Sequence, residues 1–328
     1  MEDRKQGRVC VTGGTGFVAS WLIMRLLQLG YSVNTTIRTF PDSNKDISYL
    51  RNLPGASERL HIFSADLDEP DSFGPAIKGC VGVFHVAHPM EWDEKETEDA
   101  KTKRVIGGLL GVLKASLDSK TVKRFVYTSS ATSVVFDGKD LNIIDEECWT
   151  DIDFMRGLGL YGGSYVITKT LAEKTALEFG EKHGLDVVTL VPTWIHGPFL
   201  GPRCPNSVRT SLALIFGDQE NYKFFVSTSF VHVDDVARAH THLFEYPQAK
   251  GRYICSAVEV TIDKLSEFLL ARYPEYQIPP ADSLKGITSV KISGLSSKKL
   301  METGFKYQHG LEDMFDGAIQ CCKEKGLL

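Results

Sequence analysis

The chain has 328 residues, of which 42% are hydrophobic and 24% are charged, and its formal net charge is -5. These values are typical of a globular protein with a packed core and exclude a largely disordered chain. The negative balance leaves no broad basic surface, so nucleic acid is not expected as a partner.

The N-terminus and the apolar segments predict a cytoplasmic protein. Residues Met1 to Lys5 are mostly charged and lead directly into a short apolar run, which is not the pattern of a signal peptide. No apolar stretch approaches the roughly 18 to 20 residues of a membrane span. The seven cysteines are scattered and form no C-x-x-C pair, so we expect neither disulfides nor a metal site.

The first half of the chain alternates short apolar runs with helix-length segments. We predict strands at Arg8–Thr12, Ser32–Ile37, Leu60–Ser64, Val81–Val86, Arg124–Thr128 and Asp186–Val191. Helices are predicted at Phe17–Leu29, Leu109–Leu117 and Tyr165–Phe179. Apolar runs that do not alternate suit strands covered on both faces. The predicted fold class is therefore α/β, a doubly wound parallel sheet of the Rossmann type.

After Pro192 this alternation ends, which predicts a smaller C-terminal lobe that binds substrate. The segment Pro198–Pro205 carries three prolines and is predicted to be an extended loop. Later elements are predicted as a strand at Tyr253–Cys255 and helices at Ile262–Tyr273 and Leu311–Lys325. We assign residues 1–192 to the dinucleotide-binding domain, to which the chain returns at about 228–256, and residues 193–227 and 257–328 to the lobe.

A glycine-rich turn, Gly13-Gly14-Thr15-Gly16, lies between the first predicted strand and the first predicted helix. Gly13 permits a tight turn, and Gly16 lets the backbone approach a pyrophosphate at the helix N-terminus, where free N–H groups favour anions. Ala19 is a third small position that permits close packing of the helix on the strand. Because this turn lies in an apparent βαβ unit, it predicts dinucleotide binding.

The end of the second predicted strand indicates which dinucleotide binds. NAD-binding proteins usually carry an Asp or Glu there, whereas this chain has Arg38, followed by Lys45. A guanidinium forms a forked pair with a 2′-phosphate, which a carboxylate would repel. We therefore predict NADPH or NADP+ as the cofactor. Asp66 and Leu67 are placed to border the adenine, although Asp66 could instead cap the following turn.

Tyr165 and Lys169 form a Y-x-x-x-K pair at the start of a predicted helix, where this spacing puts both side chains on one face. The Lys169 ammonium is expected to lower the pKa of the Tyr165 phenol and to hold the nicotinamide ribose. Ser130, at the end of the fifth predicted strand, is placed to donate a hydrogen bond to a substrate oxygen. Together the three residues predict hydride transfer between nicotinamide and a carbonyl or alcohol carbon.

With these motifs the sequence resembles the extended short-chain dehydrogenase/reductases. It resembles more closely the plant dihydroflavonol 4-reductase-like group, and within it the branch that contains vestitone reductase. The matching stretches span essentially the whole chain and are Val9–Phe17, Tyr31–Arg38, Gly79–Val86, Thr121–Ser130, Ser164–Lys174, Val231–His240 and Glu312–Gly326.

This resemblance implies a monomeric enzyme of plant specialised metabolism, with an aromatic polycyclic substrate and with Ser130, Tyr165 and Lys169 as its catalytic residues. It implies cofactor contacts at Gly13, Thr15, Gly16, Phe17, Val18, Arg38, Lys45, Asp66, Leu67, Val86, Ala87, His88, Thr128, Tyr165, Lys169, Pro192 and Ser207. Substrate contacts are expected at His88, Met90, Ser130, Val135, Val166 and Trp194.

Three of these positions depart from the family pattern. Relatives usually carry a small or hydroxylated residue where this chain has His88, which could hold or protonate the substrate, stack on the nicotinamide, or fill space while bonded to backbone. Val135 stands where dihydroflavonol reductases use a polar residue, often Asn, so a hydroxylated substrate ring would be left unpaired there. Trp194 could offer a flat apolar wall to a ring system or belong to the core.

We therefore expect NADPH-dependent reduction of a flavonoid- or isoflavonoid-like ketone to a secondary alcohol. The same residues could oxidise an alcohol or hemiacetal with NADP+, as in alkaloid-forming relatives. A non-catalytic NADP(H)-binding sensor is the alternative from another class, although such proteins typically lose the Tyr or the Lys. The segment His232-Val233-Asp234-Asp235 is interpreted as structural, with Asp234 bonded to backbone and no metal bound.

Overall fold

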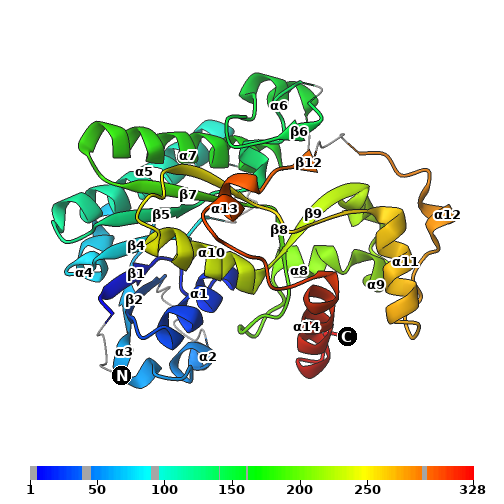
Figure 1. Ribbon diagram of the computed structural model, residues 1–328, viewed down its shortest axis with the longest axis horizontal. Coiled ribbons are helices and arrows are strands. Elements are labelled where there is room, and N and C mark those ends of the chain that lie inside the picture. The colour runs from blue at the N-terminus through cyan, green and yellow to red at the C-terminus, as the bar shows by residue number, and fades with distance from the viewer. Residues whose placement is uncertain (1–5, 39–45, 90–95, 140, 160–161, 290–293) are drawn as a thin grey trace.

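The computed structural model describes residues 6–38, 46–89, 96–139, 141–159, 162–289 and 294–328. Its main sheet consists of β1 (Arg8–Val11), β2 (Ser32–Ile37), β3 (Leu60–Ser64), β4 (Gly82–His85), β5 (Arg124–Thr128), β7 (Val187–Pro192) and β10 (Gly251–Cys255). The strands lie in the order β10-β7-β5-β4-β1-β2-β3, and every neighbouring pair is parallel (Figure 1). Strands β2 and β3 lie on one side of β1, whereas β4, β5, β7 and β10 follow one another on its other side. The sheet is therefore doubly wound, as the sequence predicts.

Helices cover both faces of this sheet (Figure 1). Successive residues of a strand point to opposite faces, so a central strand needs cover on both sides. In β1, Cys10 packs in the cluster formed with α5 (Glu98–Asp118) and α7 (Gly163–His183), whereas Val9 and Val11 pack on the other side. The helices on that second side are α1 (Phe17–Gln28) and α10 (Val233–Glu245). The core is thus split into two layers by the sheet.

Helix α5 is longer than the predicted Leu109–Leu117, because it begins at Glu98. The Thr97 hydroxyl accepts a hydrogen bond from the Ala100 N–H at 3.3 Å and caps the helix, and acidic residues in its first turn favour the positive end of the helix dipole. The prediction missed this half because its residues are mostly polar and carry no apolar period. A Cβ at Gly108 would lie 2.8 Å from Leu67, so the helix packs closely on the preceding segment.

The lobe is built on a second sheet of β8 (Trp194–His196), β9 (Ser227–His232) and β11 (Val258–Thr261), with β9 in the centre. Its core contains Phe225, Phe230 and Phe315, which are fully buried, and the Phe230 ring centroid lies 5.8 and 5.9 Å from the other two. The helical elements of the lobe are α8 (Asn206–Ser211), α9 (Ala213–Phe216), η3 (Gln219–Phe225), α11 (Ile262–Arg272), α12 (Ala281–Leu284) and α14 (Leu311–Glu324).

The chain returns from the lobe to the large sheet later than the expected residue 228. Strand β9 pairs with β8 and β11 and belongs to the small sheet, and the large layers resume at α10 and β10. The reason is that β9 serves both cores, since Phe230 packs in the lobe and Val231 packs with Val188 and α10.

The remaining elements are short. They are α2 (Ser48–Arg51), α3 (Ala56–Arg59), η1 (Pro70–Phe73), α4 (Gly74–Ile77), η2 (Ala131–Ser133), α6 (Ile152–Leu158), α13 (Lys298–Glu302) and the parallel pair β6 (Ile143–Ile144) and β12 (Gly294–Leu295). Within the described part of the chain, no helix has both the length and the apolar character needed to cross a membrane. The cytoplasmic location and the monomeric state stay predictions.

Candidate active site

The glycine turn joins β1 to α1 at the carboxyl end of the sheet. Gly13 has a φ of +75°, which favours glycine, and a Cβ there would lie 3.0 Å from the Ala87 Cα. Gly16 is the N-cap of α1 and has no side chain to bond the N–H groups of the first turn. The backbone N–H groups of Phe17 and Val18 can therefore bind an anion there, and this geometry fits a dinucleotide pyrophosphate.

Gly14, the middle glycine of this turn, had no predicted role. A Cβ at Gly14 would lie 2.3 Å from the Thr35 Oγ1 of the neighbouring strand β2. The Gly14 N–H also donates to the Thr36 carbonyl at 2.9 Å. The turn therefore packs directly against β2.

Thr12 is a second site residue that was not predicted from the sequence. Its hydroxyl oxygen accepts hydrogen bonds from the N–H groups of Val86 and Ala87, both at 3.1 Å, and lies 2.9 Å from His85 Nδ1. This side chain ties the carboxyl end of β4 to the glycine turn. Val86 and Ala87, both expected to contact the cofactor, are therefore held next to Gly13. A Thr before the glycines was the available signal.

The expected adenine side of the site lies at the carboxyl ends of β2 and β3. Arg38 directly follows β2 and is partly buried, while Lys45 lies outside the described residues. The Asp66 carboxylate accepts a hydrogen bond from the Asp68 N–H at 3.1 Å, so Asp66 does cap the turn that follows β3. Leu67 packs against α5. The Ala65 N–H bonds the Ile37 carbonyl at 3.1 Å, which keeps these two strand ends adjacent.

The structure brings the three expected catalytic residues together. Tyr165 lies in the first turn of α7 and Lys169 one turn later, while Ser130 is the N-cap residue of η2. The side chains of Ser130 and Tyr165 are hydrogen-bonded. The Lys169 ammonium donates to the Thr128 carbonyl at 3.0 Å, at the carboxyl end of β5. Thr128 is further fixed by its hydroxyl, which lies 2.7 Å from His240 Nε2.

The electrostatics of this cluster differ from one expectation. Burial raises the pKa of the Tyr165 phenol, and its hydrogen bond with Ser130 opposes this rise. The expected lowering of the Tyr165 pKa is therefore wrong as a net shift, because burial outweighs the contribution that opposes it. Burial lowers the pKa of Lys169 to about 8, against the opposing charge of Glu173. Tyr165 is consequently protonated at neutral pH and suited to donate a proton.

His88 contacts Tyr165 directly. Its ring meets the Tyr165 ring edge-on, with centroids 5.4 Å apart and an interplanar angle of 85°. Burial holds the pKa of His88 well below its usual range, and the Lys169 charge lowers it further. The imidazole is therefore neutral at neutral pH and a weaker proton donor than an imidazolium. Met90, the other expected substrate contact in this segment, lies outside the described residues.

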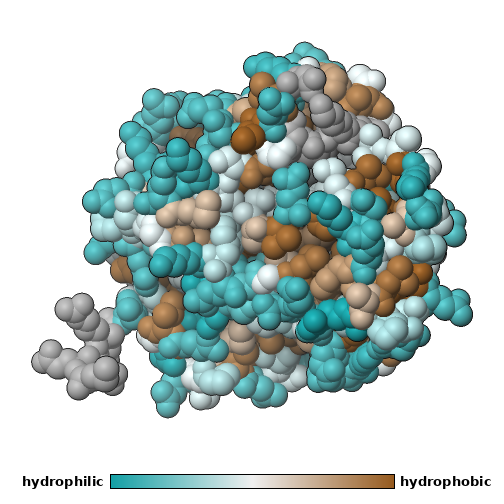
Figure 2. Space-filling model, turned by 45° about the vertical axis from the view of Figure 1, so that its right-hand side comes forward, coloured by the Kyte–Doolittle hydropathy of each residue, from teal (hydrophilic) through white to brown (hydrophobic). Residues whose placement is uncertain are grey.

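The other expected substrate contacts lie in different packing environments. Val135 borders a small core cluster, and Val166 is only 6% exposed and packs with Met155. The Trp194 indole donates to the Ser207 carbonyl at 2.9 Å, and its ring centroid lies 5.9 Å from that of Phe224. Trp194 thus packs on the lobe core while remaining partly exposed. Figure 2, with the lobe turned forward, shows hydrophobic side chains grouped between hydrophilic margins.

The last two expected cofactor contacts, Pro192 and Ser207, lie at the end of β7 and in α8. The Ser207 carbonyl also accepts a hydrogen bond from the Ser211 hydroxyl at 2.7 Å. Both expected contacts follow the carboxyl edge of the large sheet, on the side where the lobe begins.

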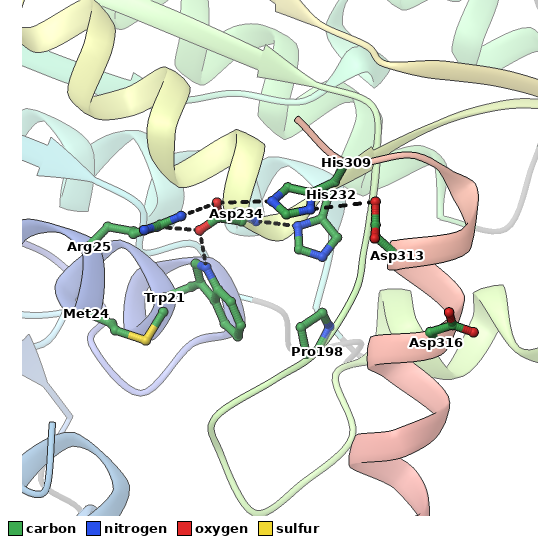
Figure 3. A pocket seen from close by; sticks show the side chains of 9 residues that line it. All are labelled: Trp21, Met24, Arg25, Pro198, His232, Asp234, His309, Asp313 and Asp316. Atoms are coloured by element: carbon green, nitrogen blue, oxygen red, sulfur yellow. Dashed lines mark hydrogen bonds and ion pairs between the residues drawn. The ribbon is translucent and has the colours of Figure 1, made fainter. Parts of the chain in front are cut away.

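A separate pocket of about 470 Å³ lies where α1, α10 and α14 meet (Figure 3). Its lining contains none of the three expected catalytic residues. It consists of Trp21, Met24, Arg25, Pro198, His232, Asp234, His309, Asp313 and Asp316. The expectation that Asp234 bonds backbone is wrong. Its carboxylate accepts from Trp21 Nε1 at 2.8 Å and pairs with Arg25, whereas the adjacent Asp235 bonds the backbone N–H groups of Gln308 and His309.

Within the residues that the structure describes, no three His, Cys, Asp or Glu side chains are arranged to hold a metal ion. The imidazoles of His232 and His309 instead stack on each other, with centroids 4.1 Å apart.

The fold and this site define a doubly wound α/β protein with a glycine turn of the dinucleotide-binding type. The chain belongs to the NAD dependent epimerase/dehydratase family, whose model matches residues 9–255. Within that family it belongs to the dihydroflavonol 4-reductase-like group, as the resemblance predicted. It is 53% identical to vestitone reductase of Medicago sativa, over 98% of this chain and 99% of that protein.

Two further relatives are Protein BRI1-5 ENHANCED 1 of Arabidopsis thaliana, at 53% identity over 98% of this chain and 90% of that protein, and dihydroflavonol 4-reductase of Hordeum vulgare, at 44% identity over 99% and 92%. The crystal structure of vestitone reductase from alfalfa superposes with a TM-score of 0.90 at 52% identity, covering 98% of this chain and 100% of that one.

Proposed function

We propose that this chain is an NADPH-dependent reductase that converts the ketone of a flavonoid- or isoflavonoid-like molecule to a secondary alcohol. The observation that carries the proposal is the meeting of Ser130, Tyr165 and Lys169 at the carboxyl edge of the sheet. The similarity to vestitone reductase and to dihydroflavonol 4-reductases supports the ketone class.

The cofactor would lie along the same edge. The first turn of α1 would hold the pyrophosphate, Arg38 and Lys45 the 2′-phosphate, and Lys169 the nicotinamide ribose. NADPH bound there would supply the hydride that reduces the carbonyl carbon.

The catalytic residues act on the substrate oxygen. Ser130 and Tyr165 donate hydrogen bonds to it and stabilise the charge that develops there. Tyr165 then gives up its phenolic proton to form the alcohol, and the Lys169 ammonium on the same helix face stabilises the phenolate that remains. Because burial raises the Tyr165 pKa, the phenol carries its proton at neutral pH and can donate it to the substrate oxygen.

The decisive variant is Tyr165→Phe, tested with purified protein, NADPH and vestitone, a dihydroflavonol or a flavanone. Loss of the proton donor is expected to lower kcat by about 10²- to 10⁴-fold, while NADPH affinity stays nearly unchanged because the ring is retained. Tyr246→Phe is the matched control, since Tyr246 stacks on His242 and bonds none of the catalytic residues. Wild-type turnover in Tyr165→Phe would overturn the proposed mechanism.

The choice of nucleotide is tested by Arg38→Gln. Removing a charged donor from the 2′-phosphate is expected to raise the KM for NADPH about tenfold or more and to leave the KM for NADH unchanged. An equal effect on both nucleotides would contradict the assignment of Arg38.

A further inference from the structure

A buried carboxylate lies directly beneath the catalytic residues, on the same helix. Glu173 follows Lys169 by one turn of α7 and is fully buried. The reaction proposed above gives it no direct role. A buried carboxylate is costly unless it is paired and hydrogen-bonded, so its partners indicate its purpose.

The partners of Glu173 come from η2, β7, β10 and the short link between β5 and η2. Oε2 accepts hydrogen bonds from the hydroxyls of Ser129 and Ser133, both at 2.6 Å, and Oε1 accepts from the Thr189 hydroxyl, also at 2.6 Å. Arg252 of β10 donates to both oxygens, at 2.9 Å from Nε and 3.1 Å from Nη2. Five donors therefore use the acceptor capacity of one carboxylate.

The Arg252 guanidinium also contacts groups other than Glu173. Its Nη1 donates to the carbonyls of Glu146 and Cys148, at 3.0 and 2.6 Å, and Nη2 also donates to the Ser133 hydroxyl at 3.1 Å. The guanidinium stacks 3.4 Å from the ring centre of Trp149. The Glu173–Arg252 pair therefore connects the segment after β6 to α7 and β10 through hydrogen bonds.

Two of the five bonds fall on either side of the catalytic serine. Ser129 and Ser133 flank Ser130, and both donate to the same carboxylate oxygen. The segment 129–133, which contains Ser130, is thereby bonded to α7 on both sides of Ser130, and α7 also carries Tyr165 and Lys169. A misplacement of about 1 Å in such a site can cost roughly 10²-fold in rate.

We propose that Glu173, held by Arg252, is a positioning residue that fixes Ser130 relative to Tyr165 and Lys169. The inference rests on the proposed function, because it presupposes that Ser130 acts on the substrate oxygen. Thr189 binds the same carboxylate from β7 and does not adjoin Ser130, which supplies an internal control.

The experiment compares three variants, Ser129→Ala, Ser133→Ala and Thr189→Val, each of which removes one hydroxyl that donates to Glu173 at 2.6 Å. The serine variants, and most strongly their double mutant, are expected to lower kcat by about tenfold or more, with KM and NADPH affinity nearly unchanged. Thr189→Val is expected to keep kcat within about twofold of wild type, since the backbone at Ser130 stays anchored. Thermal unfolding of all three reports the purely structural contribution of each bond.

A loss of kcat that is equal in the serine and threonine variants would overturn the proposal, as would wild-type kcat in the double serine mutant. Ser130→Ala and Tyr165→Phe are measured in parallel. If they remain active, the proposed function itself fails. If they are inactive while the flanking serines behave like Thr189→Val, only the positioning role of Glu173 fails.

Discussion

Two of the arginine–carboxylate pairs in the protein use the same chemistry in different surroundings. Glu173 and Arg252 lie beneath the catalytic residues, with side chains 0% and 7% exposed. Asp234 and Arg25 lie at the edge of the pocket in Figure 3, where the aspartate is buried but the arginine is 34% exposed. The first pair joins α7 to β10 of the large sheet, and the second joins α1 to the start of α10.

Solvent access makes the difference between the two pairs. In the interior, neither charge can be compensated by water if its partner is removed, so every donor and acceptor must be met by the protein. At the pocket, water reaches the Arg25 guanidinium and weakens its attraction to Asp234. For the same reason, removing the pair should lower the free energy of unfolding only slightly. We expect the interior pair to control stability and catalytic geometry, and the pocket pair to affect only stability.

The largest effect is expected for Arg252→Met. It leaves the Glu173 carboxylate buried without its cation, and the free energy of unfolding should fall by about 3 to 5 kcal/mol, measured by urea denaturation. Adding Glu173→Gln should recover part of this loss, because the uncompensated charge is then removed. A loss below about 1 kcal/mol would show that Arg252 does not compensate Glu173.

Arg25→Met is the matched change at the pocket and should cost only about 1 kcal/mol. Asp234 still accepts from Trp21 Nε1 and contacts His309, so its charge keeps two partners and access to water. Urea denaturation measures this value as well, with Arg25→Lys as a control that retains the charge. A loss as large as that of Arg252→Met would remove the distinction between the two pairs.

Acid should weaken the pocket pair in a defined range. Burial raises the pKa of Asp234, but the bonds from Arg25 and Trp21 outweigh it and lower the pKa to about 2. Its folded pKa thus lies below the unfolded value of about 4, so its contribution is present above pH ~4 and is lost as pH falls towards about 2. We expect a loss of about 1 kcal/mol or less after allowing for the exposure of Arg25. Asp234→Asn should reduce the fall in unfolding free energy between these pH values by this amount, while other carboxylates with lowered pKa values, such as Asp316, still titrate.

The smallest effect concerns the pH profile of kcat. The charge of Glu173 raises the pKa of Lys169, which burial otherwise lowers to about 8. Glu173→Gln should therefore move the alkaline fall of kcat to lower pH, by less than about one unit. Asp234→Asn should leave the alkaline fall of kcat unchanged, because Asp234 lies in the separate pocket shown in Figure 3. An unchanged alkaline fall of kcat in Glu173→Gln would mean that the charge of Glu173 does not affect the pKa of Lys169.

Some features of this site were readable from neighbouring residues in the chain. The glycine turn depends on contacts within a few residues, and the Tyr165–Lys169 pair on the period of a helix, so both were predicted in place. The strands of the large sheet were predicted because residues covered on both faces form continuous apolar runs. The polar first half of α5 carried no such period, and its start at a Thr97 cap was missed.

Other features arise only when distant segments meet. Glu173, four residues after Lys169, has the pattern of an ordinary charged helix position, yet its serine, threonine and arginine partners lie 16 to 79 residues away. Asp234 and Asp235 are adjacent in the chain, and only their packing decides that one takes Arg25 while the other bonds backbone. Burial likewise reversed the expected pKa shift of Tyr165. Local geometry is set by bonds between near neighbours, whereas desolvation and ion pairing depend on which elements the completed sheet brings together.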